Sequence, residues 1–120
     1  MKSVEYQTRQ LIRAIKHSNV YNQYRRLQIK IFRDEALGKR VNALRKAYFT
    51  IQNKPEAPDD MNRLETLDDE YRDILQNSDV REFLTAEQGL AFMMSQMTER
   101  IYDSLDMDVS FLDDERRKPV

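Results

Sequence analysis

Apolar residues recur every three or four positions along almost the whole chain, which is the spacing of one face of an α-helix. Residues 3–16 form the first such segment. Ser18 is then suited to cap a second helix, because its hydroxyl can accept a backbone N–H that has no partner inside the helix. The apolar residues of these two segments are Val4, Leu11, Ile12 and Ile15, followed by Val20, Tyr24, Leu27 and Ile31.

Two interruptions bound a third helix. The apolar phase breaks between Ile31 and Leu37, and Asp34 at this break can cap a new helix. Two prolines in residues 53–58 end the third helix and start a fourth, for which Asp59 is a suitable N-cap. The pattern therefore predicts a kink or short turn near residue 34 and a loop at 53–58.

The last predicted helix is long. Asn-Ser-Asp at residues 77–79 interrupts the pattern, and Ser78 or Asp79 can cap a helix that runs from Val80 to about Leu105. At 1.5 Å per residue this helix spans roughly 40 Å. One face carries an apolar stripe with a single charge, which we treat as a candidate seam for self-association or partner binding. Its members are Val80, Phe83, Glu87, Leu90, Met94, Met97 and Ile101.

Composition agrees with an all-α fold, which we expect to be an elongated bundle of about five helices with a long C-terminal helix. The long apolar stripe on that last helix leads us to expect oligomerisation through helix seams. The 120 residues include 2 Gly, 3 Pro and no Cys, too few turn-forming residues for a sandwich or barrel. The absence of Cys excludes disulfides, thiolate metal sites and a cysteine nucleophile. The single histidine, His17, lies at the end of the first helix and has no carboxylate nearby in sequence. We therefore expect no enzyme activity, no cofactor and no small-molecule substrate.

Neither a metal site nor a membrane segment is indicated. The acidic pairs 59–60, 68–69 and 113–114 lack the spacing of a calcium loop, so we interpret them as solvated surface. No apolar run approaches the roughly 20 residues that cross a bilayer. The N-terminus lacks the apolar core of a signal peptide. These features predict a cytoplasmic protein without membrane contact.

The near-zero net charge of −1 hides a strong asymmetry. Residues 1–54 carry 13 Lys and Arg against 3 Asp and Glu, whereas residues 55–120 carry 7 against 18. A basic surface with interleaved tyrosines could follow a phosphate backbone, although no nucleic-acid motif is present. The alternative is that basic helices face acidic ones within or between chains. The candidate basic surface comprises Arg25, Arg26, Lys30, Arg33, Arg40 and Arg45.

Glu87 is an unusual member of the apolar stripe, because a bare buried charge is very costly. Three interpretations are open. Glu87 forms an ion pair that fixes the register of the helices, with Arg45 or another arginine of the basic half as its partner. Otherwise it contacts another protein or is simply exposed. Methionines near Met94 fit a core, an oligomer seam or an adaptable groove. Gly38 and Gly89 inside helices suggest close helix crossings.

Several blocks resemble the YlbF/YmcA family of small helical bacterial proteins. The blocks are Leu11–Ser18 with Val20, Tyr21 and Tyr24; Asp34–Leu37 through Leu44–Phe49; and Asn77–Glu87 followed by Leu90. The third block is similar to the family's N-x-x-V-x-E-F-L-x-A-E stretch. A proline that members often carry after the Asp of the second block is replaced by Glu35. The resemblance implies one family-like domain over residues 1–105, leaving residues 106–120 as a flexible acidic and basic tail.

The resemblance also implies a role. Family members are regulators that self-associate, and the better-known ones act in a complex with one another and a further protein. That complex modulates an endoribonuclease that processes messenger RNA, and so affects competence, sporulation and biofilm formation. By this resemblance we expect a non-catalytic regulatory subunit that binds itself and related proteins. A direct nucleic-acid binder that uses the basic half is the alternative.

Overall fold

The computed structural model describes residues 3–52 and 60–107. Over these residues the fold is all-α, as predicted, and contains no strand. The helices are α1 (Val4–Lys16), α2 (Asn19–Phe32), α3 (Glu35–Gln52), α4 (Asp60–Glu70), α5 (Arg72–Leu75) and α6 (Ser78–Ser104). The shape is extended, because the radius of gyration is 17.8 Å against about 14 Å for a compact domain of this length.

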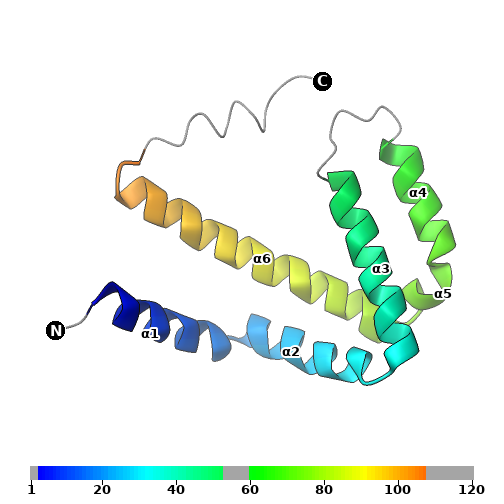
Figure 1. The fold of residues 1–120 in the computed structure, drawn as a ribbon, viewed down its shortest axis with the longest axis horizontal. Coiled ribbons are helices and arrows are strands. Elements are labelled where there is room, and N and C mark those ends of the chain that lie inside the picture. The colour runs from blue at the N-terminus through cyan, green and yellow to red at the C-terminus, as the bar shows by residue number, and fades with distance from the viewer. Residues whose placement is uncertain (1–2, 53–59, 108–120) are drawn as a thin grey trace.

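The helices form two arms that meet at a corner (Figure 1). In the first arm, α1 and α2 follow one another along one edge, and α6 runs back beside α2. In the second arm, α3 and α4 lie side by side, with α5 returning the chain to the start of α6. The molecule is only 18 Å thick, so each arm is a thin layer of helices.

The hydrophobic core lies at the corner where α2, α3, α5 and α6 meet. The ring of Phe83 is central, stacked on Tyr24 with centroids 5.3 Å apart and in edge contact with Phe32 at 5.9 Å. The largest side chains without solvent contact come from three helices: Leu27, Ile31, Val41, Leu44, Val80 and Phe83. The first turns of α6 are therefore an intramolecular anchor.

Helix capping follows the sequence prediction closely. The Ser18 hydroxyl accepts the Tyr21 N–H at 3.2 Å, and the Asp34 carboxylate accepts the Leu37 N–H at 3.1 Å, so both predicted caps are confirmed. For α6 the prediction was wrong by one residue. Asn77 caps this helix, because its side chain accepts the Asp79 N–H at 2.9 Å. The predicted cap at residue 59 lies outside the described residues.

The fourth predicted helix is interrupted at Tyr71, which raises the number of helices from about five to the six given above. Backbone hydrogen bonds continue through the break, from Tyr71 N–H to Leu67 at 2.9 Å and from Leu75 N–H to Tyr71 at 3.0 Å. The break is thus a local irregularity and not a loop. The apolar spacing is regular across it, so periodicity alone carries no sign of it.

The two helical glycines differ. A Cβ atom at Gly38 would lie 2.7 Å from the ring of Phe32, so the absence of a side chain allows the turn from α2 into α3 to close. A Cβ atom at Gly89 would meet nothing closer than Val20, at an ordinary 3.9 Å. The expected close approach is confirmed for Gly38, whereas at Gly89 the crossing leaves room for a methyl group.

Candidate protein-interaction surface

Glu87 forms an ion pair with Arg45 of the same chain. Of the three alternatives for Glu87, an ion pair, a contact to another protein or simple exposure, the structure therefore contains the ion pair. The Arg45 guanidinium approaches both carboxylate oxygens of Glu87, with Nε 3.2 Å from Oε1, and joins α3 to α6. Both side chains are about one-third exposed. The guanidinium also lies 5.3 Å from the centroid of the Phe83 ring and donates to Asn42. The charge in the apolar stripe is therefore satisfied beside the core.

Further contacts join the basic half of the chain to the acidic half. Lys30 of α2 pairs with Asp79 of α6 at 2.9 Å. Arg40 of α3 pairs with Asp73 of α5 and lies 4.7 Å from the centroid of the Tyr71 ring. These pairs show that opposite charges meet within one chain. Three of the six residues of the candidate basic surface, Lys30, Arg40 and Arg45, are engaged in this way.

The other three residues of the candidate basic surface are exposed, two of them on α2 and one at its C-cap. Arg25 donates a 2.6 Å hydrogen bond to Gln28 on its own helix. Arg26 and Arg33 are exposed. The positive surface that could face a phosphate backbone is thus smaller than the sequence suggests. Three of its six basic residues already pair with carboxylates of the same chain.

Tyr48 links the two helices of the second arm. Its phenol donates a 2.9 Å hydrogen bond to the Asp68 carboxylate. Partial burial, this hydrogen bond and the nearby negative charge together raise the pKa of Tyr48 from 10.0 to about 12. The phenol therefore stays protonated at any physiological pH and acts as a structural donor.

A cavity of about 740 Å³ opens between the two arms, lined by residues of α3, α4 and α6. The Arg45–Glu87 pair and Tyr48 lie on its polar side, whereas Leu64, Leu84 and Ala91 supply apolar surface. The described residues offer no group of three or more His, Cys, Asp or Glu side chains that could hold a metal ion. Nothing in this lining forms a nucleophile and base in contact.

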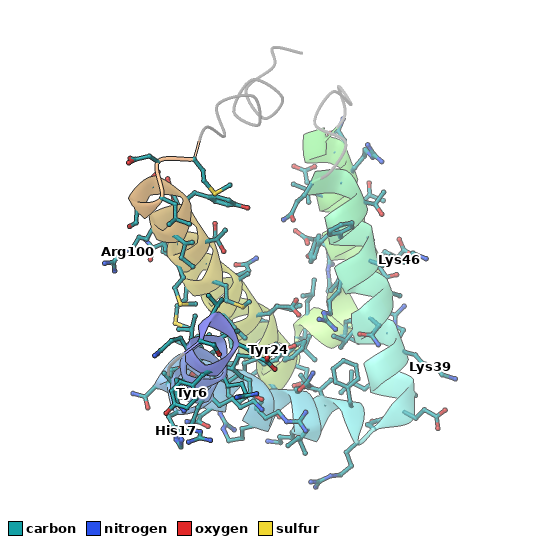
Figure 2. The ribbon with its side chains drawn as sticks, turned by 60° about the vertical axis from the view of Figure 1, so that its left-hand side comes forward. Tyr6, His17, Tyr24, Lys39, Lys46 and Arg100 are labelled. Atoms are coloured by element: carbon teal, nitrogen blue, oxygen red, sulfur yellow. The ribbon has the colours of Figure 1, made fainter. Side chains whose placement is uncertain are left out.

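The outer half of the first arm has a different surface. A groove of about 470 Å³ is lined by Leu11 of α1, by Met97 and Ile101 of α6, and by Leu105, the C-cap of α6. Leu11 is 41% exposed, Ile101 52% and Leu105 64%. Met94, 50% exposed, continues the same helical row. We call Leu11, Met94, Met97, Ile101 and Leu105 the distal face. Figure 2 shows Arg100, which also lines the groove, pointing away from α3 and α4.

The candidate seam is thus divided by the structure. Val80 and Phe83 are fully buried within the chain and Glu87 is paired with Arg45, so these three serve the core. Leu90 is half-buried. Met94, Met97 and Ile101 belong to the distal face. Sequence reasoning omitted Leu11 and Leu105 from the site, although the apolar stripe of residues 3–16 contained Leu11 and pointed to a covered face on that helix.

Among the described residues, no helix is both long and apolar enough to cross a membrane. His17, the single histidine, ends α1 as its C-cap and lies on the outer surface (Figure 2). The fold and its surfaces together define a small all-α protein whose outer helices leave an apolar face uncovered.

The chain belongs to the YlbF/YmcA family. The family model described as "Control of competence regulator ComK, YlbF/YmcA" matches residues 4–106. The chain is also similar to a curated UPF0342 protein of Caldicellulosiruptor bescii, with 27% identity over 99 residues that cover 81% of this chain and 83% of that protein. No solved structure gives a significant match. The family is linked to control of a competence regulator, and neither the family model nor this relative indicates a catalytic family.

Proposed function

We propose that this protein is a non-catalytic regulatory subunit that acts by binding other proteins, including itself and related family members. The distal face is the observation that carries this proposal. An apolar groove between two helices, with the charged Arg100 in its lining, has the features of a protein-docking surface. The family's link to control of a competence regulator supports a regulatory role.

We extend the proposal to a complex that modulates messenger-RNA processing by an endoribonuclease, with effects on competence, sporulation or biofilm formation. The family resemblance supports this step. The internal charge pairing supports a contact with RNA through a partner protein and not through this chain, since Lys30, Arg40 and Arg45 already face carboxylates.

The experiment is affinity capture of the tagged chain from native cells, with chemical cross-linking and mass spectrometry. Met94→Asp places a charge in the distal face and is expected to remove most of the captured regulatory proteins. Ser95→Asp is the matched control, because it adds the same charge at the next exposed position, off the helical row of Met94. The proposal is contradicted if wild type captures no regulatory protein, or if both variants capture as well as wild type.

The second candidate function is direct binding of nucleic acid by the basic half, favoured by the exposed Arg26 of α2 and the exposed Arg33 at its C-cap. Such binding would weaken steeply as salt rises, because counterions are released from the phosphates. A filter-binding assay at low salt separates the two functions. We expect no RNA retention by the isolated chain, and salt-sensitive retention that Arg26→Gln with Arg33→Gln abolishes would favour the second function.

A further inference from the structure

The groove of the distal face combines apolar side chains with one positive charge. Its apolar lining comes from Leu11, Met97, Ile101 and Leu105, and its single charged side chain is Arg100. Arg100 is exposed, and its guanidinium forms no ion pair within the part of the chain that the structure describes. An occupant that matches this groove therefore carries apolar side chains and negative charge together.

Helix α6 ends beside this groove, because its C-cap Leu105 belongs to the lining. Asp106, the next residue, has a φ of 52°, a left-handed conformation that Asp adopts more readily than most residues with a side chain. Its N–H donates to the Asp103 carbonyl, and the Met107 N–H donates to the Tyr102 carbonyl, both at 3.2 Å. These two bonds form a Schellman motif, which turns the backbone away from the helix axis. The chain therefore leaves α6 sideways, at the end of the groove.

The segment that follows has the chemistry that the groove lacks. Residues 108–120, which we call the tail segment, lie outside the described residues and beyond the family match, which ends at residue 106. Three apolar side chains near its start are followed directly by three carboxylates, in the order Val109, Phe111, Leu112, Asp113, Asp114 and Glu115. Apolar anchors for the groove and negative charge for Arg100 thus occur together in one short stretch.

We propose that the tail segment folds back over the groove of its own chain and controls access to it. Phe111 and Leu112 supply the apolar contacts, and the carboxylates after them face Arg100. The control of access rests on the proposed function, because a partner that binds the distal face must first displace the tail segment. The docking itself does not depend on any partner.

The reach of the tail segment fits this groove and not the cavity between the arms. Residues 97–105 of α6 run about 12 Å along the groove. An extended chain advances at most about 3.3–3.6 Å per residue, so residues 108–112 reach up to ~17 Å from Met107. The cavity between the arms has Ala91 as its outermost residue on α6, about 24 Å back along the helix. The two anchors therefore reach all of the groove but fall short of the cavity.

Attachment to the same chain favours the tail segment over a separate partner. A segment joined to its site by a few residues has an effective concentration in the millimolar range there. A contact with a dissociation constant of about 1 mM between separate molecules is then about half occupied within one chain. Occupancies between about one half and nine tenths raise the apparent dissociation constant of a competing partner about two- to tenfold. Weak docking is therefore enough to control access.

Nuclear magnetic resonance of the full chain tests the docking, with a nitroxide spin label as the probe. The chain has no cysteine, so Ser110→Cys gives one labelling position, next to the anchors. A docked tail segment should broaden the amide signals around Leu11 strongly and leave those of α4, in the other arm, unchanged (Figure 1). The control carries the same label with Phe111→Ser and Leu112→Ser and should lose most of the broadening around Leu11. Circular dichroism checks that its helices are unchanged.

A second pair of variants tests the charge of the groove. Arg100→Glu should reduce the broadening around Leu11 by at least about half, because it places a carboxylate opposite those of the tail segment. Lys46→Glu makes the same change of charge at an exposed position of α3 and is the matched control. It should leave the broadening as in the wild type. An equal response to both variants would contradict a contact with Arg100.

Mixing shows whether the docking occurs within one chain. A spin-labelled chain without isotope is mixed with an isotope-labelled chain that carries no spin label. Broadening around Leu11 in this mixture would place the tail segment on another copy and would overturn the proposal. Broadening that is equal with and without the two anchors would also overturn it, because the tail segment would then have no fixed site.

Capture of regulatory proteins separates the docking from the proposed function. Removal of the two anchors should raise the captured amounts about two- to tenfold, and equal capture would contradict control of access. A tail segment that docks on a chain that captures nothing, with or without its anchors, would refute the proposed function and leave the docking standing. Capture that depends on Met94, without docking, would overturn the proposal about the tail segment alone.

Discussion

The two halves of α6 belong to one helix but have opposite surroundings. The first turns carry Val80 and Phe83, which lie against α2 and α3 without solvent contact. The outer turns carry Ile101 in the same helical row, and it is half exposed. A single helical stripe is therefore buried at one end and exposed at the other, and the helices that cover it decide where the change occurs.

The largest effect is expected from truncation in the inner half. Phe83→Ala removes a fully buried ring that contacts Tyr24, Phe32 and Arg45, and should lower the free energy of unfolding by about 3–5 kcal/mol. Phe92→Ala, at a 65% exposed position on the same helix, is the control and should change stability by less than about 0.5 kcal/mol in the monomer. Urea unfolding followed by circular dichroism measures both. If both variants lost the same free energy of unfolding, the inner and outer halves of α6 would not differ as described.

The glycines provide the next contrast. Gly38→Ala forces a methyl group against the Phe32 ring, which the edge contact with Phe83 holds in place, and should destabilise by about 1–3 kcal/mol. Gly89→Ala fills open space and should stabilise α6 by up to about 1 kcal/mol through helix propensity. Thermal and urea unfolding show whether each variant is more or less stable than the wild type. Stabilisation by both would show that the turn between α2 and α3 is loose.

A smaller effect is expected from the ion pair that joins the arms. A double-mutant cycle with Arg45→Gln and Glu87→Gln should give a coupling energy of about 1 kcal/mol, because the pair is about two-thirds buried and fixed beside Phe83. The exposed pair Glu35–Lys39, with atoms 3.6 Å apart on α3, is the matched control and should give about 0.3 kcal/mol. A coupling energy no larger than that of the control would make Glu87 an ordinary surface residue.

The last effect concerns Tyr48 in the second arm and is seen only at alkaline pH. Its pKa of about 12 in the folded protein exceeds the 10.0 of an unperturbed tyrosine, so folding favours the protonated phenol. The stability contributed by this shift is complete below pH 10 and is lost as the pH rises toward 12. Tyrosinate absorbance should show a late titration step that Tyr48→Phe removes and Asp68→Asn moves to lower pH. A titration that is unchanged in both variants would contradict the assignment.

Much of the fold could be predicted from the sequence because it is locally encoded. Apolar spacing located the helices, and the Ser18 and Asp34 caps were visible as single residues at phase breaks. An ion pair between Glu87 and an arginine such as Arg45 could be predicted as one alternative, since a buried charge in an apolar stripe requires a partner. The asymmetry between the basic and acidic halves likewise pointed to contacts such as Lys30–Asp79.

The division of the candidate seam could not be predicted. Periodicity shows that Val80 and Ile101 share a face but not which helix covers each of them. The groove depends on Leu11 and Met97 lining it together, an arrangement of segments far apart in the chain that no local pattern encodes. The interruption at Tyr71 was hidden for a related reason, because the apolar spacing runs through it unchanged.

Amide hydrogen exchange as a function of protein concentration tests the central contrast most directly. If the distal face joins two copies, protection of α1 and of residues 94–104 should rise with concentration through the range in which the dimer forms. Protection around Leu27, Val41 and Phe83 should stay constant over that range, apart from global unfolding. Protection of α1 that is the same at every concentration would contradict the account.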